Sequence, residues 1–374
     1  MCERSHKSWL LDHITRTSFQ LSYSQFQQPD FSMSRPKKEF SKLDYCQYLL
    51  SSQTNYTLTN YAEHVAKVSH DLVNRFLATE RLTASNVWRE VKNDIVASEN
   101  GYVVFDDTVL DKEHSKKIDS VRWQYSGNAH KVIRGIGLLN CVYVNPDTEQ
   151  FWIIDYRIFD PDKDGKTKVQ HVKEMLNNLK NHKKLPFKTV LMDTWYANYQ
   201  LMLHIHHMEK LFYCPLRKNR LTRPLDSDEK YQHVSLLNWD EESYKTGQLV
   251  QLKNMPKEIP LKLFSISVSP NRIDRVVTND TNQSCSDDTK NICAIRWYVE
   301  QFHREIKQLT GIEKCPCRKQ RIQRNHITCA IQVWVFLKRK AHQTGQTVYQ
   351  LKKNLLKDYL TKELVEPQLK FSFA

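Results

Sequence analysis

The sequence predicts a mixed α/β protein whose central sheet is flanked by helices. Two observations support this fold class. Short apolar runs of strand length alternate with helical periodicity from residue 100 onwards, whereas the segment before it keeps helical spacing. The 374 residues are also enough to bury one large core with appendages, or two to three modest domains. We therefore expect a helical N-terminal part, a mixed sheet and a further inserted segment.

The N-terminal third is expected to hold an arm and a separate helical domain. Residues 1–35 are rich in Ser and Gln and poor in aliphatic side chains, which is typical of a flexible arm that orders only with a partner. Residues 36–99 carry apolar side chains at helical spacing, such as Tyr61, Val65 and Leu72. Short helices between polar turns are typical of DNA-binding modules and also of other small bundles. We interpret this domain as DNA-binding and keep the second interpretation open.

Residues 100–217 are expected to form the first part of the core. The Asn145-Pro146-Asp147 turn predicts a hairpin between two long apolar segments. Three consecutive strands followed by helix, strand, helix and strand is the order expected of a ribonuclease H-like core. The expected elements are strands at 102–105, 132–144 and 151–159, a helix through 169–179, a strand at 188–192, a helix reaching His207 and a strand at 211–215.

The remaining residues divide into three parts. Residues 218–288 contain strand-like pieces at 231–239, 248–252, 261–268 and 273–278 between polar turns, which predicts a β-rich insertion domain. Helical periodicity resumes at Ile292, so residues 289–342 are expected to be the second part of the core. Residues 343–374 are expected to form a C-terminal helical region.

The charge of the chain indicates a polyanionic partner. The 56 Lys and Arg against 42 Asp and Glu give a net charge of +14, and binding that neutralises phosphates would release counterions. Nucleic acid is therefore the first candidate. The segment from Gly311 to Thr347 concentrates this charge, because its only acidic residue is Glu313. A solvated basic face remains the alternative interpretation of that segment.

Cysteine usage and hydropathy indicate where the protein works. Nine cysteines, an odd number, lack the dense pattern of a disulfide scaffold, so we expect free thiols in a reducing compartment. Cys315-x-Cys317 has no second pair of ligands nearby, so a zinc site is not expected. No apolar run approaches 18 residues. We expect a cytoplasmic protein with no membrane contact.

Three acidic residues are predicted to share one site. Asp107 follows the apolar run 102–105, and Asp193 follows the run 189–192. Adjacent parallel strands deliver residues at their carboxyl ends to the same crevice of a sheet. Period-2 alternation sends only one of Asp106 and Asp107 to that crevice, and we favour Asp107. The third acid is Glu300, on a helix whose 100° advance per residue puts it on one stripe with Arg296, His303 and Lys307.

This set of residue types points to metal-dependent chemistry on phosphodiesters. Several carboxylates at one site repel one another unless a cation compensates, and Mg²⁺ or Mn²⁺ does so while keeping positions open for water and phosphate. Two such ions can activate an attacking oxygen and stabilise the leaving one. The alternative is an ordinary helix surface, since Arg296 and Glu300 are spaced i, i+4 and stabilise any helix modestly.

Three motifs resemble the DDE transposases of bacterial insertion sequences, of the type called insertion-sequence-family four. They are Asp106-Asp107-Thr108, Asp193-Thr194-Trp195-Tyr196 and Arg296-Trp297-Tyr298-Val299-Glu300. The second motif looks most similar to the seven-zero-one branch. The family signature on the last helix is Tyr, two residues, Arg, three residues, Glu, six residues and Lys. Arg296, Glu300 and Lys307 match that spacing, whereas Cys293 stands where the family has Tyr.

The resemblance covers about 101–337 and implies a function. Asp107, Asp193 and Glu300 would bind two Mg²⁺ ions, with Mn²⁺ as a substitute. The enzyme would nick the terminal inverted repeats of its element with water, and the freed 3′-hydroxyl would then attack target DNA. It would act as a homodimer on double-stranded DNA in a bacterial cytoplasm, at the nucleoid. The residues that would contact DNA are Arg296, His303, Arg304 and Lys307 beside the acids, Trp239 on a flipped base, and Lys314, Arg318, Lys319, Arg321 and Arg324 on the backbone.

Two other functions remain open at this point. The same scaffold could be a structure-selective nuclease that cuts branched DNA without joining strands. It could also be a domesticated, non-catalytic DNA-binding protein, although all three acids are present.

Overall fold

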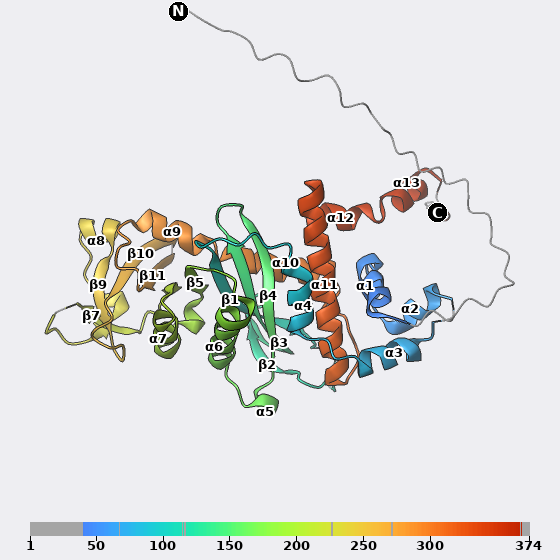
Figure 1. Ribbon diagram of the computed structural model, residues 1–374, viewed down its shortest axis with the longest axis horizontal. Helices are drawn as coiled ribbons and strands as arrows, with labels where there is room; N and C mark the ends of the chain where they lie inside the picture. The colour runs from blue at the N-terminus through green and yellow to red at the C-terminus, as the bar shows by residue number, and fades with distance from the viewer. Residues whose placement is uncertain are drawn as a thin grey trace, which may run out of the picture. The chain divides into compact units, whose positions relative to one another are not determined.

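A computed structural model describes residues 40–368 apart from 67, 114, 116, 226, 271 and 367 (Figure 1). The arm expected at 1–35 lies outside the described residues. The chain from Phe40 onwards forms one compact unit. Its helices are α1 Lys42–Ser51, α2 Leu58–His64, α3 His70–Thr79, α4 Ala84–Val91, α5 Pro161–Asp164, α6 Lys168–Asn178, α7 Tyr199–His207, α8 Glu241–Thr246, α9 Ser286–Ala294, α10 Trp297–Leu309, α11 Gln320–Thr344, α12 Val348–Asn354 and α13 Lys357–Val365.

The strands join in one mixed sheet of eleven strands within the described part of the chain. Its order is β2-β3-β1-β5-β6-β11-β10-β9-β7-β8, with β4 paired to β3. The strands are β1 Tyr102–Asp111, β2 Arg122–Ser126, β3 Lys131–Asn145, β4 Gln150–Phe159, β5 Thr189–Met192, β6 Leu211–Pro215, β7 Leu221–Pro224, β8 Gln232–His233, β9 Gln248–Leu252, β10 Leu261–Ser269 and β11 Arg272–Thr278.

The centre of this sheet has the predicted ribonuclease H-like arrangement. β3 runs antiparallel between β1 and β4, whereas β5 is parallel to β1 and β6 is parallel to β5. The parallel pairs are joined through α6 and α7, because a parallel connection has to cross back over the sheet. The fold class predicted from the sequence is confirmed.

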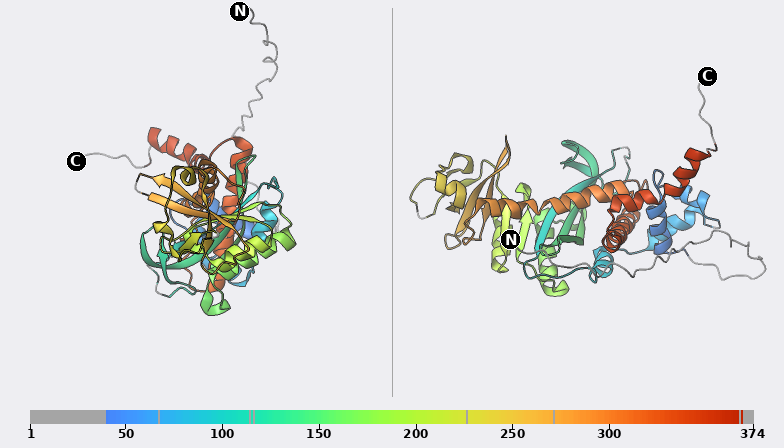
Figure 2. Two further views of the ribbon diagram at one scale, coloured as in Figure 1. Left: turned by 90° about the vertical axis from the view of Figure 1, so that its left-hand side faces the viewer. Right: turned by 90° about the horizontal axis from the view of Figure 1, so that it is seen from above.

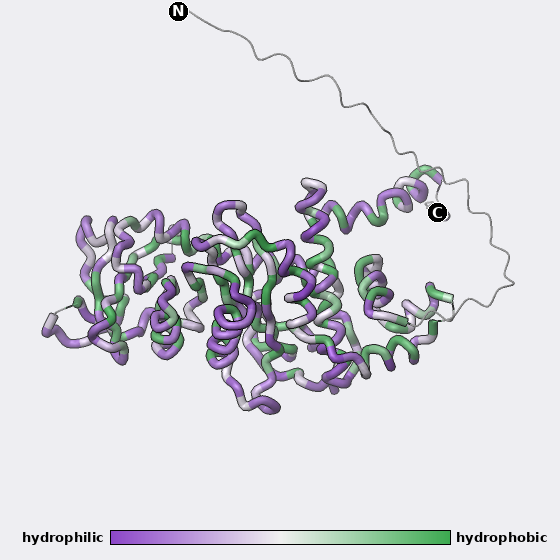
Figure 3. Tube along the Cα trace, viewed as in Figure 1, coloured by the Kyte–Doolittle hydropathy of each residue, from purple (hydrophilic) through white to green (hydrophobic). Residues whose placement is uncertain are grey.

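Side chains of β1 divide between two cores. Val103 and Phe105 lie in the core under α6 and α7, and Val104 and Leu110 lie in the core under α10 and α11. The helices therefore form layers on both faces of the sheet (Figures 1 and 2). The hydropathy-coloured trace shows hydrophobic segments in the central strands and hydrophilic residues around α5 (Figure 3). Both faces of β1 are thus buried up to residue 105, which explains its continuous apolar run.

The N-terminal helices share their core with α11, which differs from the separate domain expected at 36–99. The Tyr45 hydroxyl lies 2.9 Å from Nδ1 of His326, and both side chains are buried. Nδ2 of Asn325 donates to the backbone carbonyls of Leu77 and Glu80 at 2.7 Å. These contacts join positions more than 240 residues apart, so local periodicity could not reveal them. The helices expected at 36–99 are present, and their buried residues belong to the same core as those of α11.

The β-rich segment also continues the central sheet. β11 pairs antiparallel with β6, with Val277 opposite Cys214, so the strands of 218–288 extend the core sheet. The sequence predicted β9, β10 and β11 closely and missed β2 and β7. Within the C-terminal region, the ammonium group of Lys352 on α12 donates to the carbonyls of Leu49, Leu50 and Ser52 at the end of α1. No helix in the described residues is long and apolar enough to span a membrane.

Candidate active site

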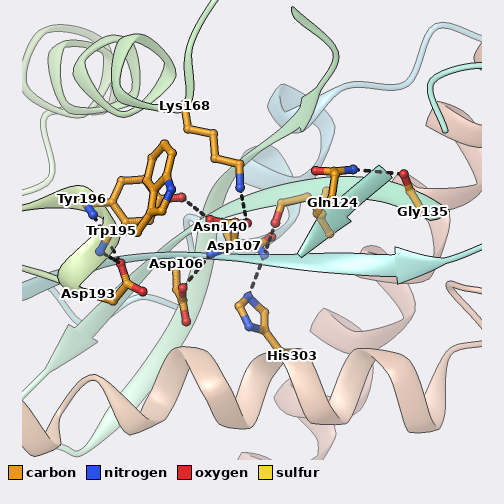
Figure 4. Close-up of polar contacts among 11 residues, drawn as sticks. Asp106, Asp107, Gln124, Gly135, Asn140, Lys168, Asp193, Trp195, Tyr196 and His303 are labelled. Atoms are coloured by element: carbon orange, nitrogen blue, oxygen red, sulfur yellow. Dashed lines mark hydrogen bonds and ion pairs between the residues drawn. The ribbon is translucent and has the colours of Figure 1, made fainter. Parts of the chain in front are cut away.

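Two neighbouring aspartates on β1 point to opposite faces of the sheet. Successive side chains of a strand alternate, so Asp106 follows Val104 toward α10 and Asp107 follows Phe105 toward α6. Figure 4 shows the two carboxylates diverging from the strand in this way. The two residues therefore have different neighbours.

Asp107 is held by two donors of the protein. Nζ of Lys168 lies 2.6 Å from Oδ2 of Asp107, and the hydroxyl of Tyr196 donates to Oδ1 at 2.6 Å (Figure 4). The Lys168 ammonium is itself placed over the rings of Phe159 and Trp195, at 5.3 and 5.1 Å from their centroids. Both carboxylate oxygens of Asp107 are thus engaged within the folded chain.

Asp106 lies in a different electrostatic environment. Burial raises the pKa of Asp106 to about 7, and the carboxylates of Asp193 and Asp107 add to this rise, while Arg296 opposes it. Nη1 of Arg296 lies 3.8 Å from Oδ2 of Asp106, and the Asp107 amide donates to Oδ1 at 2.8 Å. A carboxyl with this pKa lacks sufficient positive charge around it, and a bound cation would supply that charge.

Asp193 is fixed beside Asp106 by the parallel strands and by a turn. The register places Phe105 opposite Met192, so Asp106 within β1 lies beside Asp193, which follows the end of β5. Asp193 caps the helical turn Thr194–Tyr196, and its Oδ1 accepts from the amide of Trp195 at 2.8 Å. Figure 4 shows Asp193 and Asp106 on the side of the sheet that faces α10.

Glu300 reaches the same region from α10. Nη2 of Arg296 donates to Oε1 of Glu300 at 2.9 Å, in the i, i+4 pair expected from the sequence. Because Nη1 of the same guanidinium lies near Asp106, Arg296 stands between these two acids. Arg296 therefore separates two carboxylates that would otherwise repel each other.

His303 anchors α10 to the sheet. Its Nε2 lies 2.8 Å from Nδ2 of Asn140, which is opposite Asp106 in the β1–β3 register (Figure 4). The same amide group also donates to the carbonyl of Leu138, so Nε2 of His303 acts as the acceptor. Burial lowers the pKa of His303 to about 3, and Lys307 and Arg296 lower it further. His303 is therefore neutral and accepts from Asn140 while it also lines the cleft, and its expected contact with DNA stays a prediction.

The other two basic residues of the α10 stripe differ in their availability. Nζ of Lys307 donates to the carbonyl of Val109 at 2.8 Å and lies 3.3 Å from Glu313. The guanidinium of Arg304 lies 4.7 Å from the ring centroid of Trp297. Lys307 is committed to partners in the protein, whereas Arg304 is held only by a ring on its own helix in the contacts described.

These groups line one cleft of about 930 Å³. It brings together the three acids predicted from the sequence, and Asp106 as a fourth. Several lining residues were not predicted as site residues from the sequence. Two of them could have been, because Trp195 lies two residues after Asp193 and Trp297 lies next to Arg296. The missed lining residues are Thr108, Val109, Gln124, Tyr125, Gly127, Asn128, His130, Phe159, Lys168, Trp195, Arg272, Trp297 and Gln308.

Other residues expected to bind DNA lie away from this cleft. Trp239 packs within the β-rich segment, where its ring lies 4.7 Å from the guanidinium of Arg275 and 5.5 Å from the ring of Tyr244. It is partly buried against the core there, and its expected contact with a flipped base stays a prediction. The basic residues of the α10–α11 connection and of α11 are exposed and do not line the cleft, namely Lys314, Arg318, Lys319, Arg321 and Arg324.

The donor set fits a hard divalent cation in its chemistry. Asp106 and Asp193 offer carboxylate oxygens at the cleft, which are the ligands that Mg²⁺ and Mn²⁺ prefer. In the described residues no three His, Cys, Asp or Glu side chains are grouped closely enough to hold a metal ion. Glu300 is paired with Arg296 and Asp107 with Lys168, so two of the four acids are held by cations of the protein.

Sequence comparison assigns the family. A model of the transposase DDE domain matches residues 98–336, which include all four acids of the cleft. The chain belongs to this DDE transposase family. No curated protein matches the chain.

Three solved structures have a distant likeness to this DDE transposase. A piggyBac transposase synaptic complex with hairpin DNA has 10% identity and a TM-score of 0.47, over 92% of this chain and 77% of that one. The Drosophila P element transposase strand transfer complex has 10% identity and a TM-score of 0.29, over 90% and 88%. Ciona intestinalis endonuclease V in complex with inosine-containing DNA has 11% identity and a TM-score of 0.30, over 60% and 96%.

Proposed function

We propose that this DDE transposase cuts the ends of an insertion sequence and joins them to target DNA by metal-dependent hydrolysis and transesterification. The observation that carries the proposal is that Asp106, Asp193 and Glu300 line one cleft of a family member. The finer assignment to bacterial insertion sequences of family-four type rests on the motif spacing around Glu300, and the seven-zero-one branch rests on the motif Asp193-Thr194-Trp195-Tyr196.

We assign Asp106 as the first metal-binding acid, where the sequence favoured Asp107. Asp106 shares the α10 face with Asp193 and Glu300, whereas both oxygens of Asp107 already accept from Lys168 and Tyr196. Bound Mg²⁺ or Mn²⁺, as one or two ions, would activate the attacking oxygen and stabilise the leaving one. The residues that would hold these ions are Asp106, Asp193 and Glu300.

The remaining side chains of the cleft position acids and phosphates. Arg296 keeps Glu300 and Asp106 apart in the folded chain, and its guanidinium can turn to a phosphate once a cation pairs with the two carboxylates. Arg304 and Arg272 add positive charge to the lining, which favours a DNA backbone. The partner is double-stranded DNA with terminal inverted repeats, bound by a homodimer.

The substitution Glu300→Gln tests the role of the third acid. Glutamine keeps the size of the side chain and removes the charge that a cation needs, so we expect metal-dependent cleavage of the element ends to fall about 1,000-fold or more. Cleavage would be measured on labelled end oligonucleotides with Mg²⁺ and with Mn²⁺. Tyr359→Ala, at an exposed residue of α13, is the matched control. Cleavage by Glu300→Gln at the wild-type rate would remove Glu300 from the site.

Strand transfer distinguishes this function from that of a nuclease. We expect pre-cleaved ends with a free 3′-hydroxyl to be joined to target DNA without further hydrolysis. Cutting of branched DNA with no joining would instead support a structure-selective nuclease. Short inverted repeats flanking the coding sequence would support a mobile element, and their absence would favour a domesticated DNA-binding protein.

A further inference from the structure

The ribbon formed by β2 and the start of β3 exposes an aromatic surface beside the cleft. Trp123 is 65% exposed and Tyr125 is 64% exposed, and both project from the same face of β2. Their cross-strand partners, Arg134 and Val132, lie on that face as well. We call these four residues the ribbon surface. Large aromatic rings exposed to this degree cost solvation free energy, so a ligand is expected to cover them.

The alternation of β2 is the reverse of that of an ordinary edge strand. Gln124 and Ser126 turn to the buried side, and the two aromatic rings turn to solvent. Nε2 of Gln124 donates to the carbonyl of Gly135 at 3.0 Å, which fixes the strand in this orientation (Figure 4). This hydrogen bond therefore keeps the rings of Trp123 and Tyr125 on the solvent side of β2.

The ribbon surface is continuous with the candidate active site. Tyr125 lines the cleft that contains Asp106 and Asp193, and so do Asn128 and His130 from the turn between β2 and β3. A ligand that passes out of the cleft along β2 meets Tyr125 first and Trp123 next. The surface is thus placed to hold a part of the substrate that extends from the reacting phosphate.

The charge of the ribbon indicates which class of ligand it can bind. Residues 121–134 contain two arginines, one lysine and one histidine and no carboxylate. Arg122 and Lys131 pair with Asp162 and Glu113 outside the ribbon, at 3.2 and 3.9 Å. The guanidinium of Arg134 lies 5.9 Å from the ring centroid of Trp123. A second copy of this chain would bring two basic ribbons together, whereas a polyanion complements them.

We propose that the ribbon surface is a stacking platform for unpaired bases of the DNA that leaves the cleft. Side chains two apart on a strand are separated by about 6.6 Å, which allows each ring to take one base of an unstacked strand. Trp123 and Tyr125 would supply the stacking. This inference rests on the proposed function, since it takes the cleft to be the DNA site.

Binding to single-stranded and duplex DNA tests the platform. The probes are a labelled oligothymidine of about 12 nucleotides and a blunt duplex, measured by fluorescence anisotropy in EDTA so that no strand is cut. We expect Trp123→Ala and Tyr125→Ala each to weaken single-strand binding about tenfold, and to leave duplex binding within about twofold. Trp123→Phe keeps a stacking ring and should restore most of the loss.

Two control variants separate stacking from charge and from folding. Tyr359→Ala removes an exposed tyrosine away from the ribbon and should change neither affinity. Arg324→Ala removes an exposed charge and should weaken both DNAs alike if it contacts phosphate. Thermal unfolding of each variant shows whether it folds. If an alanine variant does not fold, DNA binding is compared between Trp123→Phe and the parent protein instead.

The outcomes separate this proposal from the proposed function. Unchanged single-strand binding by a folded Trp123→Ala, Tyr125→Ala double variant would overturn the platform, and so would an equal loss on both DNAs. A change in oligomeric state on size exclusion without a change in DNA binding would assign the surface to a second copy. Binding is measured without metal, so it does not depend on whether the protein cleaves DNA. Failure of the proposed cleavage activity would therefore not be mistaken for failure of the stacking platform.

Discussion

At the scale of single residues, the site depends on which face of β1 each aspartate takes. Asp107 is paired with the Lys168 ammonium and accepts a hydrogen bond from Tyr196, whereas Asp106 has Arg296 as its nearby cation. The same residue type in adjacent positions thus has two roles, one holding the site together and one available to a metal. Arg296 can serve Asp106 and Glu300 in turn because a guanidinium has several donors.

Paired substitutions separate the two roles. Asp107→Asn leaves the partly buried ammonium of Lys168 without its carboxylate, so we expect the free energy of unfolding to fall by about 1–3 kcal/mol. Asp106→Asn removes a buried charge, so stability should hold or rise, while cleavage should fall about 1,000-fold. Urea unfolding and end cleavage measure the two effects. The opposite pattern would make Asp107 the metal ligand.

At the scale of elements, α11 joins the N-terminal helices to the sheet. His326 on this helix is enclosed, with Tyr45 on Nδ1 and the carbonyl of Gly311 3.1 Å from Nε2. Burial lowers the pKa of His326 to about 3, and Lys112 contributes to the decrease. The imidazole is therefore neutral in the folded protein, and α1 packs against an uncharged helix face.

This buried histidine makes stability depend on pH. The unfolded chain binds a proton at His326 near pH 6.5 and the folded chain only near pH 3. The contribution of the neutral ring is therefore complete above pH 6.5 and is lost as the pH falls toward 3, at up to about 1.4 kcal/mol per pH unit. Urea unfolding between pH 7 and 4 measures this slope, and His326→Gln should reduce it. An unchanged slope in that variant would contradict the prediction.

At the scale of the whole molecule, one core spans the sheet and the N-terminal helices. Trp334 of α11 packs edge-on against Phe302 of α10 at 4.8 Å, and its indole donates to the buried carboxylate of Glu305 at 2.7 Å. The same core continues to Leu49 and Val73 in α1 and α3. Parts that share buried surface in this way are expected to unfold together.

Thermal unfolding should therefore show one cooperative transition. We expect far-ultraviolet circular dichroism and tryptophan fluorescence to give coincident midpoints. Trp334→Ala should lower the free energy of unfolding by about 3–5 kcal/mol and move both signals together. Leu364→Ala, at an exposed side chain of α13, is the matched control. An early transition confined to the helical signal would show an independent N-terminal domain.

The sequence predicted the features that depend on local pattern. The strand before Asp193 and the Arg296–Glu300 pair were confirmed, because an apolar run and i, i+4 spacing determine them. The strand expected at 102–105 is also present, but β1 continues through Asp107 to Asp111, so Asp107 does not lie at its end. The face taken by Asp106 could not be predicted, since Val103, Val104 and Phe105 are all buried and show no alternation. The strand β2 could not be predicted either, because its aromatic side chains point to solvent and its polar side chains point inward. The shared core was missed because Tyr45 and His326 meet only in the folded chain.

The position of Lys352 has a consequence for anyone who shortens or tags this protein. Its ammonium satisfies the last carbonyls of the first helix, which would otherwise lack partners. Removal of the chain from this lysine onwards is therefore expected to fray the C-terminal end of α1, about 300 residues away in sequence. A truncation on the C-terminal side would then appear as a loss of stability in α1.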